Sequence, residues 1–73
     1  MTLIEIARIY TDLVNLDNSI PDNESVAKEV VGVLRSQYHQ LLMDRFNEEG
    51  IGYVDRFDAM YKAFELVERE AVP

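Results

Sequence analysis

Residues 24–49 read ESVAKEVVGVLRSQYHQLLMDRFNEE, a stretch with no proline and a single glycine, Gly32. Its apolar residues recur at alternating steps of four and three, the spacing of a helix that packs along a neighbouring helix. The residues of this seam are Ala27, Val31, Leu34, Tyr38, Leu41 and Arg45, widened by Val30 and Leu42. The spacing predicts a helix over 24–49. We expect Asp22 or Asn23 to cap its start and Gly50 to end it in a left-handed conformation.

The segment before this helix carries the signals of a shorter one over 3–16. Thr2 and Glu5 form a T-x-x-E capping box, a pair that satisfies free backbone donors where a helix starts. The apolar residues that follow fan over about half of the helix circumference, which is wide for a helix with one buried face. Turn-forming residues and Pro21 then separate this helix from the next.

A third helix is predicted over 53–71, where the same spacing relates Tyr53, Phe57, Met60, Phe64, Val67 and Ala71. Two matching seams joined by a glycine turn predict an antiparallel hairpin of the second and third helices. The sequence therefore predicts an all-α fold: a three-helix bundle in one domain, 1–73, built on that hairpin with a shorter N-terminal helix. The expected core residues are Ile6, Tyr10, Leu13, Val30, Leu34, Phe64 and Val67.

The composition narrows the classes of function. Fourteen acidic residues against seven basic ones give a net charge of −7, which repels nucleic-acid phosphates, so no nucleic-acid partner is expected. No run of about 20 apolar residues could cross a bilayer, and the first residues lack the pattern of a signal peptide. The chain has no cysteine, which rules out thiolate catalysis and cysteine-based metal sites within it. A cytoplasmic protein without membrane association is expected.

No motif predicts catalysis, a cofactor or a metal. The only histidine, His39, lies off the seam and has no carboxylate three or four residues away, so we expect a solvated helix residue. The stretch 45–56 resembles a calcium loop in its middle, but Arg45 and Arg56 stand where the first and last carboxylates belong. No nucleophile has a base beside it in the sequence. We expect no catalytic, cofactor-binding or metal-binding residues, and hence no enzyme.

The predicted hairpin leaves apolar residues uncovered at its turn end, because the first helix is too short to reach them. These residues are Leu42, Met43, Phe46, Ile51, Tyr53, Val54 and Phe57. They predict a contact with a protein partner of unknown identity or with a second copy, as a homodimer that completes a larger helical bundle. The alternative is a compact monomer in which the second helix bends over its own core.

A chain of this length forms a small core, and association is a common supplement to it. The sequence therefore predicts a noncatalytic, regulatory or inhibitory protein-interaction module that acts as a homodimer. Two other functions fit the same composition. One is an acidic nucleic-acid mimic that occupies the basic groove of a partner, and the other is a small structural subunit of a complex.

Overall fold

The computed structural model describes residues 1–71; the last two residues of the predicted domain, Val72 and Pro73, lie outside the described residues. Three helices form: α1 (Leu3–Ser19), α2 (Ser25–Glu48) and α3 (Arg56–Ala71). No strand occurs in the described part of the chain, so the all-α class with three helices is confirmed. None of these helices combines the length and the apolar character that a bilayer crossing requires.

Side chains cap the starts of α1 and α3. The predicted capping box is confirmed: the Thr2 hydroxyl accepts a hydrogen bond from the Glu5 amide at 3.2 Å, and the Glu5 carboxylate accepts one from the Thr2 amide at 2.9 Å. Helix α3 starts at Arg56 instead of residue 53. The reason is local, because the Asp55 carboxylate accepts a hydrogen bond from the Asp58 amide at 2.9 Å, which is the geometry of an N-cap.

The connection between α1 and α2 begins later than predicted. Helix α1 continues to Ser19 and stops where Ile20, the residue before Pro21, takes an extended conformation. A turn closed by the Glu24 amide and the Pro21 carbonyl, 3.0 Å apart, then includes the expected capping residues 22 and 23. Glu24 precedes α2 without a side-chain capping bond, so the predicted N-cap is wrong.

The end of α2 follows the prediction. The helix runs unbroken through Gly32 and ends before Gly50, whose φ of 71° is the predicted left-handed conformation. The Ile51 amide donates to the Phe46 carbonyl at 2.8 Å, and the Gly50 amide donates to the Asn47 carbonyl at 3.3 Å. This pair of bonds is a Schellman motif, and it brings Ile51 against Phe46.

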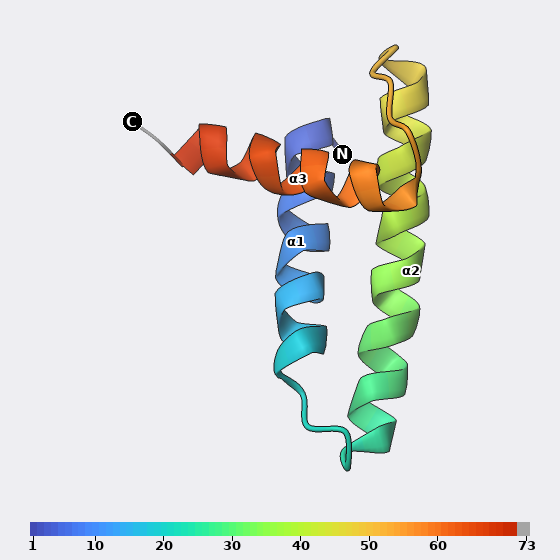
Figure 1. Cartoon of the computed structure of the whole chain (residues 1–73), viewed down its shortest axis with the longest axis vertical. Coiled ribbons are helices and arrows are strands. Elements are labelled where there is room, and N and C mark those ends of the chain that lie inside the picture. Colours follow the sequence, from blue (N-terminus) through green and yellow to red (C-terminus); the bar gives the residue numbers. More distant parts are fainter. Residues whose placement is uncertain (72–73) are drawn as a thin grey trace.

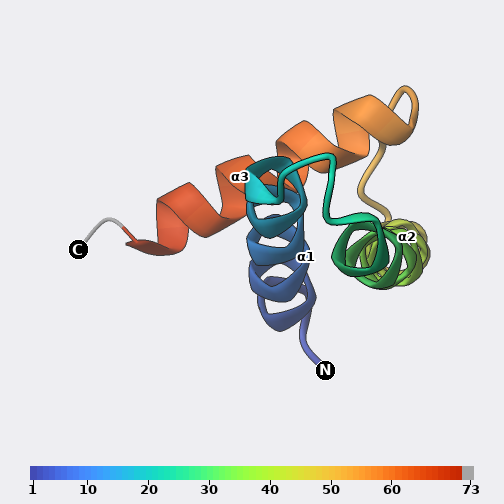
Figure 2. The same ribbon diagram turned by 90° about the horizontal axis from the view of Figure 1, so that it is seen from below.

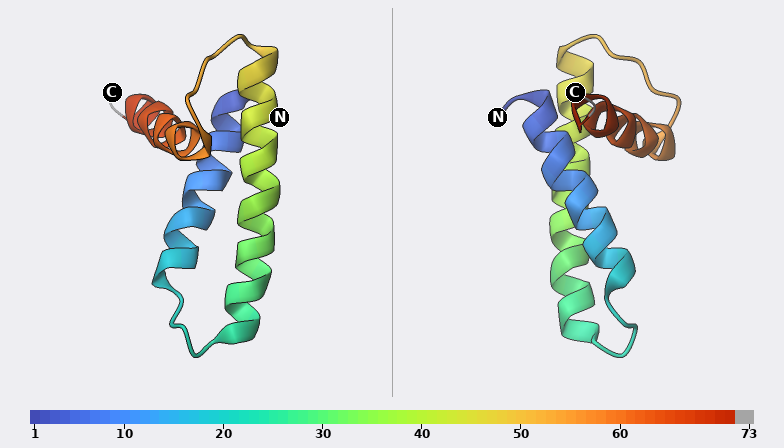
Figure 3. Two further views of the ribbon diagram at one scale, coloured as in Figure 1. Left: turned by 45° about the vertical axis from the view of Figure 1, so that its right-hand side comes forward. Right: turned by 90° about the vertical axis from the view of Figure 1, so that its left-hand side faces the viewer.

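The arrangement of the helices differs from the prediction. Helices α1 and α2 lie side by side in opposite directions, and α3 crosses one side of this pair (Figures 1 and 2). The antiparallel partner of α2 is therefore α1 and not the third helix. The connection 49–55 is longer than the roughly two to five residues that join a tight helical hairpin, and it carries the chain back across the pair. Figure 3 shows α3 on one side of the pair, and no other helix in residues 1–71 covers the opposite side.

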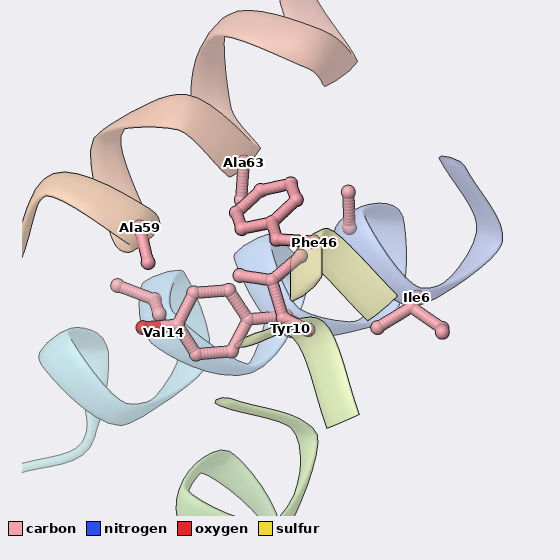
Figure 4. Packing of buried hydrophobic residues seen from close by; sticks show 8 residues of the cluster. Ile6, Tyr10, Val14, Phe46, Ala59 and Ala63 are labelled. Carbon is pink, nitrogen blue, oxygen red and sulfur yellow. The ribbon is translucent and has the colours of Figure 1, made fainter. Parts of the chain in front are cut away.

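The core lies where the three helices meet. Its buried apolar residues are Ile6, Ala7, Tyr10, Val14, Leu42, Phe46, Ala59 and Ala63. Ala59 and Ala63 stand one helical turn apart and point from α3 toward the large side chains below (Figure 4). Because alanine is small, α3 can lie close over α1 at this crossing.

The predicted core is correct on α1 and wrong on α2. Ile6 and Tyr10 are buried, and Leu13, Phe64 and Val67 are half-buried. Val30 and Leu34 are exposed. The buried residues of α2 are instead His39, Leu42 and Phe46, each one position after a residue of the predicted seam. A helix turns by about 100° per residue, so the buried face is rotated by that angle from the predicted one.

Two phenylalanines test this assignment. Phe46 has no exposed surface and Phe57 is 66% exposed. Phe46→Ala should lower the free energy of unfolding by about 3–5 kcal/mol, because it leaves a cavity in the core. Phe57→Ala should change it by less than about 1 kcal/mol. Urea unfolding followed by circular dichroism measures both, and equal losses would show that the two rings are not buried as described.

Candidate functional site

The residues predicted to form an interface divide into three groups. Leu42 and Phe46 have no exposed surface and belong to the core of the chain itself. Met43, Ile51 and Tyr53 are half-buried against that core. Val54 and Phe57 are exposed. The turn end of α2 is therefore largely covered from within the chain, because α1 pairs with α2 as far as Phe46.

The uncovered apolar surface lies elsewhere on α2. We define the outer face of α2 by Val26, Val30, Val33, Leu34, Gln37 and Leu41, which share one side of the helix and are all exposed. This side is turned away from the buried residues His39, Leu42 and Phe46. The predicted seam, including Val30 that widens it, shares Val30, Leu34 and Leu41 with the outer face. These shared residues are exposed, whereas Tyr38 of the seam packs against the core.

The outer face is also free of charge. From Val30 to Met43 the only charged residue is Arg35, in a chain of which 29% is charged. The Arg35 guanidinium points the other way, toward α1, where it donates to the Asp17 carboxylate at 2.9 Å. A long exposed helix face without charge is unusual on a surface that meets only water.

His39 connects all three helices on the inner side of α2. Its Nδ1 atom lies 3.2 Å from the Tyr10 hydroxyl of α1, and its Nε2 atom lies 3.0 Å from the carbonyl oxygen of Arg56 in α3. A carbonyl oxygen only accepts, so Nε2 carries the proton and donates. In the neutral ring Nδ1 then accepts from the Tyr10 hydroxyl. The rings of Tyr10 and His39 also contact each other, with centroids 5.0 Å apart.

The prediction that His39 is solvated is wrong, since the residue is only 7% exposed. The sequence contains a signal for this. His39, Leu42 and Phe46 are spaced by three and four, so the histidine belongs to a second apolar stripe. Its partners, Tyr10 and Arg56, lie 29 and 17 positions away and follow no local pattern.

The surroundings of His39 favour its neutral form. Burial lowers the pKa of His39, and the positive charges of Arg56 and Arg35 lower it further. The hydrogen bond to the Arg56 carbonyl opposes this shift in part. Burial also raises the pKa of Tyr10, so that its hydroxyl remains a donor at neutral pH. The pair is a structural connection between uncharged groups.

Beside this connection lies a cleft of about 360 Å³. It opens between α2 and α3 and is lined by Tyr10, Arg35, Ser36, His39, Arg56, Phe57 and Met60. A second cavity, of about 330 Å³, lies between Phe46 and the second half of α3. Within residues 1–71 no three histidine, cysteine or carboxylate side chains are grouped so that they could hold a metal ion.

Comparison of the chain with known protein families, curated proteins and solved structures finds no match. The outer face of α2 and the cleft beside His39 are therefore interpreted from their own residues.

The His39 geometry predicts a pH dependence of stability. The ordinary pKa of histidine is 6.5 and that of His39 is lower, so between these values the unfolded chain binds more protons than the folded one. The free energy of unfolding should therefore rise with pH through this window, level off above 6.5, and fall on acidification. Urea unfolding between about pH 5 and pH 8 measures this dependence.

His39→Gln is the matched variant, because glutamine offers a donor and an acceptor but does not titrate. Its stability should vary less than that of the wild type over the same range. Glu5 and Asp58 have lowered pKa values, so their protonation reduces the free energy of unfolding only at lower pH, below their ordinary pKa values of 4.5 and 3.8. Equal pH slopes for the two proteins would contradict a buried, neutral His39.

Proposed function

We propose that this chain is a noncatalytic protein-interaction module that pairs with a second copy of itself through the outer face of α2. The observation that carries the proposal is the exposed, uncharged apolar stripe between Val26 and Leu41. It has the spacing of a helix contact and extends for about 24 Å along the helix, at 1.5 Å per residue. The expected role, regulatory or inhibitory binding of another protein, belongs to the same proposal.

The stripe is suited to pair with itself. In an antiparallel pair of α2 helices, a twofold axis between Val33 and Leu34 would place these two residues opposite each other across the contact. The same axis would place Val26 opposite Leu41. Apolar side chains would then meet apolar side chains at these positions, and Gln37, the one polar residue of the stripe, would lie opposite Val30.

The charge distribution supports a second copy as the partner. Each chain carries a net charge of −7, so two copies repel unless their carboxylates stay apart. The charge-free face lets the two helices approach, while Glu29 lies beside the stripe and Asp44 lies beyond its last residue, Leu41. Because the remaining repulsion is screened by salt, added salt should not weaken the dimer. By contrast, added salt would steeply weaken a contact between an acidic nucleic-acid mimic and a basic groove.

The energetics of the small core also support association. Three of its eight buried apolar residues are alanines, and the large buried side chains are Tyr10, Phe46 and Leu42. A chain of this size buries a limited fraction of its surface on folding, so its stability is marginal. Burial of the outer face in a dimer would add stability that depends on protein concentration.

Two valine substitutions test the dimer. Val33 is 53% exposed within the outer face, and Val54 is 90% exposed outside it. Val33→Asp should convert the dimer to the monomer of 8.5 kDa, because a twofold contact would bring two carboxylates together in an apolar environment. Val54→Asp makes the same chemical change and should leave the dimer intact. Sedimentation equilibrium at concentrations on the order of 100 µM measures both.

The wild type should sediment at about twice 8.5 kDa. A monomeric wild type at that concentration would contradict self-association, and dissociation by both substitutions would contradict the assignment of the contact to α2. In either case the outer face would remain a candidate contact for a different protein.

A further inference from the structure

The cleft beside His39 differs in charge from the rest of this acidic chain. Two of the seven basic residues, Arg35 and Arg56, line it, and no carboxylate does. The second cavity, by contrast, includes Glu65 beside its two basic residues. We propose that the cleft between α2 and α3 binds a small organic anion, in which a carboxylate or phosphate group is attached to a flat apolar body.

The Arg35 guanidinium is held in place at one side of the cleft. One of its terminal nitrogens donates to the Asp17 carboxylate at 2.9 Å, and the other lies 3.9 Å from the sulfur of Met60, a cleft residue. Guanidinium has five N–H donors, so these two contacts leave donors for an oxyanion. A guanidinium fixed by a carboxylate loses less freedom when it binds a ligand.

Arg56 supplies the second charge from the first turn of α3. Among the described residues its guanidinium has no carboxylate within ion-pair distance, which is also true of Arg8 and Arg69, whereas Lys28, Arg35 and Lys62 each have one and Arg45 has two. Its backbone carbonyl is held by His39 at 3.0 Å, which fixes the start of the side chain relative to the cleft. Arginine pairs readily with planar oxyanions because its N–H groups match their geometry.

The other walls of the cleft fit an apolar body. Phe57 is 66% exposed at the rim and Met60 is half-buried, so both present apolar surface that a flat group could cover. Ser36 adds one exposed hydroxyl. The volume of about 360 Å³ falls within the range of small-molecule sites, roughly 300–1,000 Å³.

The ligand site and the proposed dimer contact are separate. The cleft lies on the inner side of α2, next to His39, and none of its residues belongs to the outer face of α2. Anion binding therefore neither requires the dimer nor follows from it, and each proposal can fail alone.

The test is an NMR titration of the ¹⁵N-labelled full chain with phenyl phosphate and with benzoate. Inorganic phosphate is the control for the anion alone, and benzyl alcohol is the control for the apolar body alone. At least one of the two aromatic anions should bind. It should shift the NMR signals of the Ser36 and Phe57 backbone and of the Arg35 and Arg56 side chains. The shifts should saturate with a dissociation constant on the order of 1 mM. Inorganic phosphate should bind more weakly, and benzyl alcohol should not saturate.

Arg56→Gln should weaken binding by about tenfold or more, because it removes a charged hydrogen bond and keeps the backbone carbonyl that His39 holds. Arg69→Gln, on the same helix but in the other cavity, is the control and should leave the affinity unchanged. Phe57→Ala should remove the preference for phenyl phosphate over inorganic phosphate. Shifts that fail to saturate with both aromatic anions, or equal losses in the two arginine variants, would overturn the proposal.

Discussion

The arrangement of the helices depends on the imidazole ring of His39, which forms hydrogen bonds to two other helices. His39 accepts from the Tyr10 hydroxyl of α1 and donates to the Arg56 carbonyl of α3, so a single side chain of α2 ties all three helices. Because Arg56 is the first residue of α3, this bond holds the start of the third helix against α2, while Ala59 and Ala63 pack on the core. The ring is buried, and an unpaired polar atom there would be costly. Among the described residues no buried side-chain nitrogen or oxygen lacks a hydrogen-bond partner.

The placement of α3 produces two surfaces with different chemistry. Helix α3 crosses one side of the pair of α1 and α2 (Figure 2). The cleft with Arg35 and Arg56 lies between α2 and the start of α3. On the outer side of α2 no third helix of the described residues supplies cover, and an uncharged stripe of mostly apolar residues is exposed. Two of the seven basic residues line the cleft and no carboxylate does, while the outer face of α2 carries no charge, so both regions are suited to binding. We assign the cleft to a small anion and the stripe to a second copy.

The features that the sequence predicted correctly are those that depend on interactions between residues close together in the chain. The capping box at Thr2 and the left-handed end at Gly50 involve residues within a few positions of each other, and both are confirmed. The buried face of α2 was not predictable in the same way, because the helix has two apolar stripes about one residue apart. Local periodicity favours the longer stripe of the predicted seam, since the buried stripe has only Leu42 and Phe46 as apolar members beside His39. The choice depends on His39, whose partners come from distant helices, and on a connection after α2 that is too long for a tight hairpin. Leu42 and Phe46 of the predicted interface are therefore buried, whereas Val54 and Phe57 are exposed as predicted.

The most direct test of this account is the protonation state of the His39 ring, observed by long-range correlation of its carbon-bound protons with both ring nitrogens at neutral pH. The account predicts one neutral tautomer, with the proton on Nε2 and an unprotonated Nδ1, because a carbonyl oxygen can only accept and a hydroxyl can donate. A proton on Nδ1, an averaged signal from two tautomers, or a charged ring at neutral pH would contradict the connection on which the placement of α3 rests.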